Sequence, residues 1–124
     1  NASKFGDLVD TARERGMGCS NSIRGLVAGG QDPAATSNID SVIIASGGNS
    51  ITFGNLSATN INASPNAATA SPTRAVFCGG QNPSNTNIME YIPIATGGSA
   101  VDFGDLVRAQ RGGGTTSTGH GGLG

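Results

Sequence analysis

The chain lacks a surplus of positive charge, since its 124 residues carry 7 Lys and Arg against 8 Asp and Glu. Proteins that bind nucleic acid use Lys and Arg to neutralise phosphates, so this balance argues against a nucleic-acid partner. The chain also lacks a run of 18 or more apolar residues, so we expect no membrane insertion. Its first residues have neither the basic nor the apolar region of a signal peptide.

The sequence offers little room for helices. Its best helical candidate runs from Asp7 to Arg15, is closed by Gly16 and Gly18, and would last about two turns. Hydrophobic residues make up only 35% of the chain, but 21 glycines bring the apolar share to that of an ordinary globular protein. We therefore expect a folded chain and not a disordered one.

What the chain does contain is an internal repeat of about 50 residues. Three landmarks carry it: 24–33 and 74–83; 42–48 and 92–98; and Phe-Gly-Asp/Asn-Leu at 5–8, 53–56 and 103–106. The predicted divisions are 1–11 (the fourth strand of a preceding repeat), 12–58 and 59–108 (two full repeats), and 109–124 (a partial repeat with a Gly-rich tail). Because the chain begins without Met and at the end of a repeat, we expect it to be a piece of a longer polypeptide.

Each full repeat is predicted to contain four short strands separated by Gly-, Asn- and Pro-rich turns. The expected strands are 15–20, 24–30, 38–45 and 51–56, followed by 64–70, 74–80, 88–95 and 101–106. In the third strand, apolar residues point to both faces, because Ile39 and Ile43 alternate with Val42 and Ile44. Such a strand needs cover on both sides, which a stack of like sheets provides.

Groups for catalysis or metal binding are scarce. The single histidine, His120, lies in the Gly-rich tail, and no Gly-x-Ser-x-Gly motif accompanies it. Cys19 and Cys78 occupy different positions of the repeat, so we interpret them as small buried residues and not as a disulfide. Without a Cys-x-x-Cys pair or clustered histidines, no zinc site is predicted. We expect no catalytic residue, no cofactor and no metal, and therefore no enzyme.

The carboxylates follow the repeat as well. Asp40 and Glu90 share one repeat position, as do Asp7, Asn55 and Asp105, so we interpret them as structural turn or edge residues and not as a glycosidase pair.

Two arginines also recur, because Arg24 and Arg74 both stand at the entrance to the second strand. We expect charged strand ends or ion pairs there, with Asp40 or Glu90 as candidate carboxylate partners.

Each repeat resembles a kelch-type β-propeller blade. In that family a glycine doublet closes the second strand, and aromatic residues of the third and fourth strands pack between blades. The residues at these structural positions are Gly29, Gly30, Gly79, Gly80, Tyr91, Phe5, Phe53 and Phe103. The first repeat departs from the pattern with Ser41 in place of the tyrosine, and Pro93 predicts an irregularity in the third strand of the second.

The resemblance implies an all-β fold of tandem four-stranded antiparallel modules, kelch-like blades of a propeller. Because a propeller needs about four blades to close, we expect completion by oligomerisation or by a missing remainder of the chain. A fourth strand that pairs outside its own repeat would argue against the simple blade.

A narrower resemblance is to repeats in virion proteins of marine cyanophages and related tailed phages. It is carried by 73–80, 90–96 and 102–106, together with the C-terminal Gly-His-Gly-Gly-Leu at 119–123. It implies a structural or adhesive module of a tail fibre or appendage, located on the virion or otherwise extracellular.

The expected partners are further copies of the chain, giving a homo-oligomer, or other virion proteins. A host cell-surface glycan is a further candidate, contacted by the polar loops that begin at Gln31 and Asp32 and at Gln81 and Asn82. The alternatives are a secreted kelch-like lectin and a filament-forming structural protein.

Overall fold

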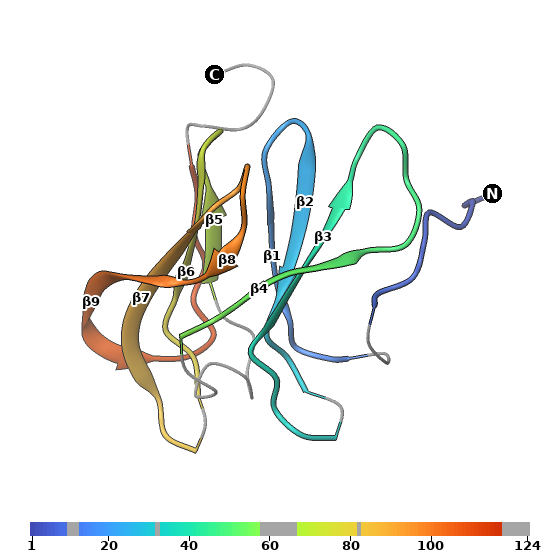
Figure 1. Cartoon of the computed structure of the whole chain (residues 1–124). Helices are drawn as coiled ribbons and strands as arrows, with labels where there is room; N and C mark the ends of the chain where they lie inside the picture. The colour runs from blue at the N-terminus through green and yellow to red at the C-terminus, as the bar shows by residue number, and fades with distance from the viewer. Residues whose placement is uncertain (10–12, 32, 58–66, 82, 118–124) are drawn as a thin grey trace.

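The structure is a computed structural model that describes residues 1–9, 13–31, 33–57, 67–81 and 83–117 (Figure 1). These residues form strands and turns, with no helix among them. The strands are β1 (Met17–Ser20), β2 (Arg24–Ala28), β3 (Asn38–Ile43), β4 (Ile51–Asn55), β5 (Ala67–Ala70), β6 (Arg74–Cys78), β7 (Thr86–Pro93), β8 (Gly98–Ser99) and β9 (Val101–Gln110).

The strands form two sheets, which lie face to face (Figure 1). The first unit is the antiparallel series β1-β2-β3-β4, and the second unit is β5-β6-β7-β9. The all-β prediction is confirmed, and each of the eight expected strands has a counterpart that begins or ends within a few residues of the expected bounds. The last strand, β9, continues to Gln110, past the expected end of the second repeat at 108.

The helical candidate at 7–15 forms no helix in the residues that the structure describes. Residues 7–9 and 13–15 are not helical, and 10–12 lie outside the described residues. Residues 5–7 are instead engaged by backbone hydrogen bonds from Gly48 and Ser50. The tertiary contact of an extended segment prevails over a short, weak helical pattern.

Pro93 is accommodated at the end of β7, opposite Arg74. A proline at this place removes no N–H from the centre of the sheet. The register shifts of β7 against β9 lie elsewhere, between Thr86 and Ile88 and between Met89 and Glu90.

The core lies between the two sheets. Residues with period-two spacing on β2 and β6 point to the shared side, because successive strand residues alternate between faces. The buried cluster is formed by Met17, Leu26, Ala28, Ile39, Leu56, Ala70, Ala75, Phe77, Ile92 and Ile94. Burial of each large side chain contributes about 1.5–3 kcal/mol, so the sheet-to-sheet contact is the main source of stability.

Strand β4 lies in the first sheet between β3 and β8, although β8 comes from the second repeat. It pairs antiparallel with β3 in its own unit and parallel with β8, which precedes the fourth strand of the second unit. A register shift between Ile39 and Asp40 bends the β3–β4 pair at this point. Because the fourth strand β4 pairs outside its own repeat, the two units are not independent simple blades.

Candidate interface between modules

The contact of a fourth strand with the following unit is formed by backbone atoms. In the parallel pair of β4 and β8, Gly54 lies opposite Gly98 and Asn55 opposite Ser99. The pair continues one residue further, where the N–H of Ala100 donates to the carbonyl of Asn55 at 2.8 Å. We call this contact, of residues 53–57 with 97–100, the second interface.

The same contact occurs at the other end of the first unit, where residues 5–9 lie against 47–50. We call it the first interface. The N–H of Gly48 donates to the carbonyl of Phe5 at 2.8 Å, and the N–H of Ser50 donates to the carbonyl of Asp7 at 2.9 Å. The bond from Ser50 to Asp7 is the counterpart of the bond from Ala100 to Asn55. The interface is thus a property of the repeat.

Side chains add two bonds to the first interface. The N–H of Asp7 donates to Oδ1 of Asn49 at 3.0 Å, and the N–H of Val9 donates to Oγ of Ser50 at 2.9 Å.

In the first two Phe-Gly-Asp/Asn-Leu motifs, the glycine is required because two backbones approach closely. A Cβ on Gly6 would lie 2.0 Å from the carbonyl oxygen of Gly48, and one on Gly54 would lie 1.9 Å from that of Gly98. No side chain fits at those distances. The receiving glycines also have φ values of 99° at Gly48 and 105° at Gly98, a conformation that L side chains rarely adopt.

The sequence pattern assigned 47–50 to a turn and missed its role as a receiving segment. The recurrence of Gly-Gly at 47–48 and 97–98 was a sequence signal for this role. It is ambiguous, because a glycine pair suits both a turn and a place where a second backbone approaches closely.

The aromatic rings of the fourth strands lie over the receiving glycines. Ring atoms of Phe5 come within 3.5 Å of a Cβ position on Gly47, and ring atoms of Phe53 within 3.0 Å of one on Gly97. Phe53 is half-buried at the second interface. Phe103 stands at the same position of the next repeat, but it is 48% exposed and packs edge-to-face on Tyr91, with 5.8 Å between ring centroids.

The two recurring arginines contact rings instead of carboxylates. The guanidinium of Arg24 lies 4.4 Å from the ring centroid of Phe53, and that of Arg74 lies 5.2 Å from the centroid of Tyr91. Within the described part of the chain neither arginine forms an ion pair, so the expected pairing with Asp40 or Glu90 is not found. Cation–π contact accounts for their positions, and it fixes the aromatic ring beside the interface.

The equivalent acids Asp40 and Glu90 are buried in the strands and are not turn or edge residues as predicted. Asp40 is 1% exposed, and its Oδ2 lies 2.6 Å from Nη2 of the buried Arg13. Glu90 is 0% exposed, and its Oε2 accepts the N–H of Ser57 at 2.6 Å. Glu90 thereby holds the end of the second interface. Arg13 was not foreseen, because the repeat has Ala at the corresponding residue 63.

A pocket of about 120 Å³ remains behind the first interface. Phe5 and Leu8 line one side, and Gly25, Val27 and Val42 line the other. The second unit has larger residues at the last three positions: Ala75, Phe77 and Ile92. There Ile92 reaches within 3.0 Å of a Cβ position on Gly54, so the second interface is filled where the first is not.

The predicted kelch-type doublets lie directly after the second strand of each unit. Gly29 donates to the carbonyl of Asn38, and Gly79 donates to that of Ile88. Gly30 and Gly80 follow, also with positive φ.

The loops behind these doublets, proposed as contact loops, lie at one end of the molecule (Figure 1). The side chain of Gln31 donates to Glu14, and that of Gln81 donates to the carbonyl of Pro83 and accepts from Arg111. Asp32 and Asn82, as well as His120, are outside the described residues.

Cys19 and Cys78 are free thiols and are half-buried. Burial raises the pKa of Cys19 to about 11 and also raises the pKa of Cys78, which is the behaviour of structural and not of reactive thiols. The described residues hold no group of three or more His, Cys, Asp or Glu suited to a metal ion. They also contain no helix that is long and apolar enough to cross a membrane.

No protein-family model matches the chain. A search of curated proteins found no similar sequence.

Proposed function

We propose that this chain is a non-enzymatic structural module that self-associates by stacking β units. The observation that carries the proposal is the same strand-to-glycine interface formed twice, with counterpart hydrogen bonds from Ser50 to Asp7 and from Ala100 to Asn55. A contact that recurs in one chain can recur between chains, because repeat modules are stabilised by covering one another.

The setting that we propose is a phage virion, in a tail fibre or related appendage, or otherwise an extracellular filament. The resemblance of 73–80, 90–96 and 102–106 to phage virion repeats supports this setting. The kelch-like features are the four-stranded unit and the doublet after its second strand. The pairing of β4 with β8 favours an open stack over a closed propeller ring.

The test is the mass of the native assembly, measured by sedimentation velocity over a range of protein concentrations. We expect species whose masses are multiples of the chain's own mass and which grow with concentration. Electron microscopy of the largest species should show rods or filaments. A chain that stays monomeric at every concentration would contradict self-association.

An adhesive role is the second part of the proposal, and the placement of the loops supports it. The loops that begin at Gln31 and Gln81 lie at one end of the molecule, so a stack of units presents them as a row. A glycan array of the wild-type chain and of a Gln31→Ala, Gln81→Ala double variant tests this. Binding that the double variant loses supports adhesion, whereas no binding by either protein leaves a purely structural role.

A further inference from the structure

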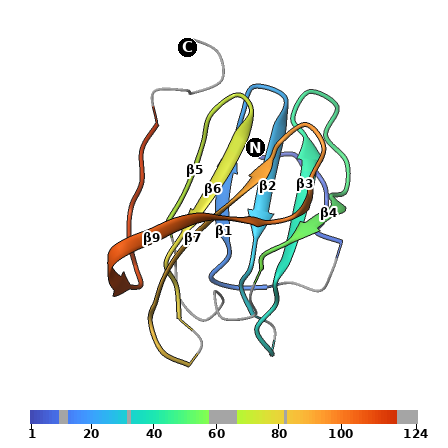
Figure 2. The same cartoon turned by 60° about the vertical axis from the view of Figure 1, so that its left-hand side comes forward.

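The Phe-Gly-Asp/Asn-Leu motif occurs three times, but only the copies at 5–8 and 53–56 form an interface in the described residues. Residues 5–9 and 53–57 each lie on a receiving glycine pair. The third copy, Phe103–Val107 in β9, pairs with β7 on one side and is the edge of its sheet on the other. Figure 2 shows β9 on the outside of the molecule. Val107 is fully exposed and Phe103 is 48% exposed.

This free edge has the same sequence as the segment that occupies the first interface. Residues 5–9 and residues 103–107 both read Phe-Gly-Asp-Leu-Val. Residues 103–107 of another copy therefore offer to residues 47–50 the same side chains and backbone groups as residues 5–9, once Gly104 leaves its present positive φ of 129°.

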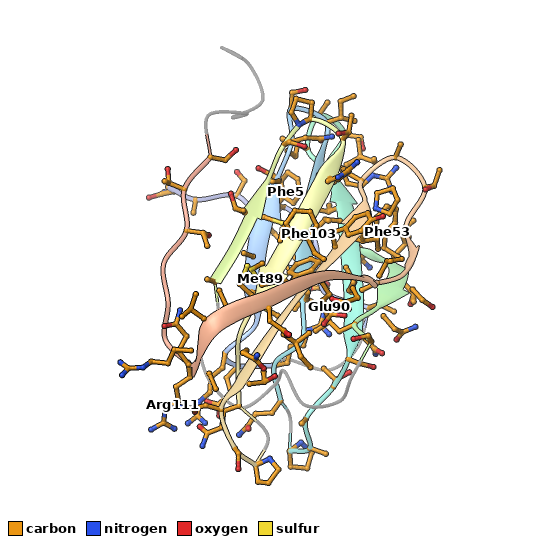
Figure 3. The ribbon with its side chains drawn as sticks, turned by 90° about the vertical axis from the view of Figure 1, so that its left-hand side faces the viewer. Phe5, Phe53, Met89, Glu90, Phe103 and Arg111 are labelled. Atoms are coloured by element: carbon orange, nitrogen blue, oxygen red, sulfur yellow. The ribbon has the colours of Figure 1, made fainter. Side chains whose placement is uncertain are left out.

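Figure 3 looks onto the outer face of the second unit, where Phe103 is labelled. Val76 and Tyr91 lie opposite each other in the register of β6 and β7, on the face turned away from Phe77. Both are only half-buried. A hollow beside them is lined by Val76 and Phe103 and by polar residues, namely Thr69, Ser71, Arg74, Thr116 and Ser117.

The outer face of the first unit has the complementary shape. Its Gly25, Val27 and Val42 are smaller than their counterparts in the second unit and leave the pocket of about 120 Å³. In the contact within the chain, the small Ser41 belongs to the face that meets Phe77 and Ile92. Tyr91 stands at the position of the second unit that corresponds to Ser41 of the first. In a contact between copies, this larger side chain would meet the small residues that line the pocket of the first unit.

We propose that a second copy of this chain docks on the free edge of β9, with its residues 47–50 receiving residues 103–107 in place of its own 5–9. Tyr91 of the first copy fills the pocket at Gly25, Val27 and Val42 of the second. This inference rests on the proposed function and names the surface through which the units stack. The contact is head-to-tail, so it repeats along an open chain.

The energetics favour exchange once two copies meet. Replacement of 5–9 by 103–107 keeps the same five residues at the receiving segment. The additional free energy comes from burial of the two outer faces and of the pocket. The segment 5–9 competes from within its own chain, so assembly depends on protein concentration.

The first experiment measures the receiving segment directly, in the full-length protein. A fluorescent peptide with the sequence of residues 101–110 is added, and its anisotropy is followed. The matched control is the same peptide with Gly104→Ala, because a Cβ at this position of the interface would lie about 2 Å from the carbonyl of Gly48. We expect the glycine peptide to bind at least tenfold more tightly. Equal binding of the two peptides, or binding of neither, would overturn the proposal.

The second experiment uses the full-length variant Tyr91→Ser, which places in the second unit the residue that the first unit has at position 41. We expect this variant to remain folded by circular dichroism and to shift self-association to at least tenfold higher concentration. Ser84→Ala, in the exposed loop, is the control and should assemble as wild type.

The outcomes separate this inference from the proposed function. Assembly that persists in Tyr91→Ser and in the presence of excess peptide overturns this docking mode and leaves a structural role intact. A chain that binds the glycine peptide selectively but stays monomeric supports the receiving segment and contradicts the self-association in the proposed function.

Discussion

Asp40 in the first unit and Glu90 in the second stand at equivalent positions and are both buried, but their partners differ. Asp40 pairs with the buried guanidinium of Arg13, whereas Glu90 accepts a backbone N–H from Ser57. The backbone interface is the same in both units, so it does not depend on which partner the buried carboxyl group has. The repeat therefore specifies the hydrogen-bonded frame, while the partner of the buried carboxyl group differs between the units.

A second difference concerns how completely side chains fill the space beside the two interfaces. Phe77 and Ile92 of the second unit belong to the core cluster, whereas Val27 and Val42 at the same positions of the first unit line a pocket. The contact within the chain is therefore closely packed, and the contact at its N-terminal side is not. Close packing suits a permanent interface, and an unfilled one can accept a new partner.

The largest effect should come from the core. We expect Phe77→Ala to lower the free energy of unfolding by about 4 kcal/mol, because the ring is fully buried between the sheets. Val27→Ala, at the equivalent position, should cost only about 1 kcal/mol. Urea denaturation at one fixed protein concentration measures both. Equal losses would mean that the two units are packed alike.

The next effect tests the buried charges. Arg13→Ala should cost about 3 kcal/mol, because it leaves Asp40 buried without its cation. Glu90→Gln should cost about 1 kcal/mol or less, because an amide oxygen still accepts the N–H of Ser57. The double variant Arg13→Met, Asp40→Leu should recover most of the loss by replacing both charges with apolar groups. If it does not, the ion pair does more than neutralise Asp40.

The two interfaces can be compared by adding one methyl group to each. Gly54→Ala should cost about 2 kcal/mol, because β4 is fixed between β3 and β8. Gly6→Ala should cost less, about 1 kcal/mol, because residues 5–9 can move away and Phe5 and Val9 are already partly exposed. Thermal unfolding of the two variants measures the difference. A greater loss in Gly6→Ala would show that the first interface is the stronger one.

The smallest effect is a pH dependence from Cys19, whose pKa burial raises from 9.0 to about 11. A pKa that is higher in the folded than in the unfolded protein stabilises the fold below the unfolded pKa. This contribution should be lost as the pH rises from about 9 to about 11, since only the unfolded thiol ionises there. Urea midpoints across this range should fall less steeply in Cys19→Ala. Identical slopes would show that the thiol is not desolvated.

Much of the fold could be predicted from the chain, because turn residues and alternating apolar residues are local signals. The contacts that Arg24 and Arg74 make could not be predicted in this way. Their ring contacts with Phe53 and Tyr91 join residues on different strands, and repeat spacing alone does not distinguish a ring partner from a carboxylate partner. Arg13 was missed for the same reason, since its partner Asp40 is distant in sequence and the second repeat has no arginine to match it.

The all-β class, the two units and the positions of their strands follow from the sequence, because they depend on repeated patterns of turn and apolar residues. The pairing of β4 with β8 of the second repeat, and the role of Gly48 and Gly98 in receiving residues of another unit, emerge only in the folded chain. Backbone hydrogen bonds between distant segments use groups that every residue carries, so no particular residue type predicts them. The only trace of such bonds in the sequence is the glycines, whose missing side chains allow the two backbones to approach.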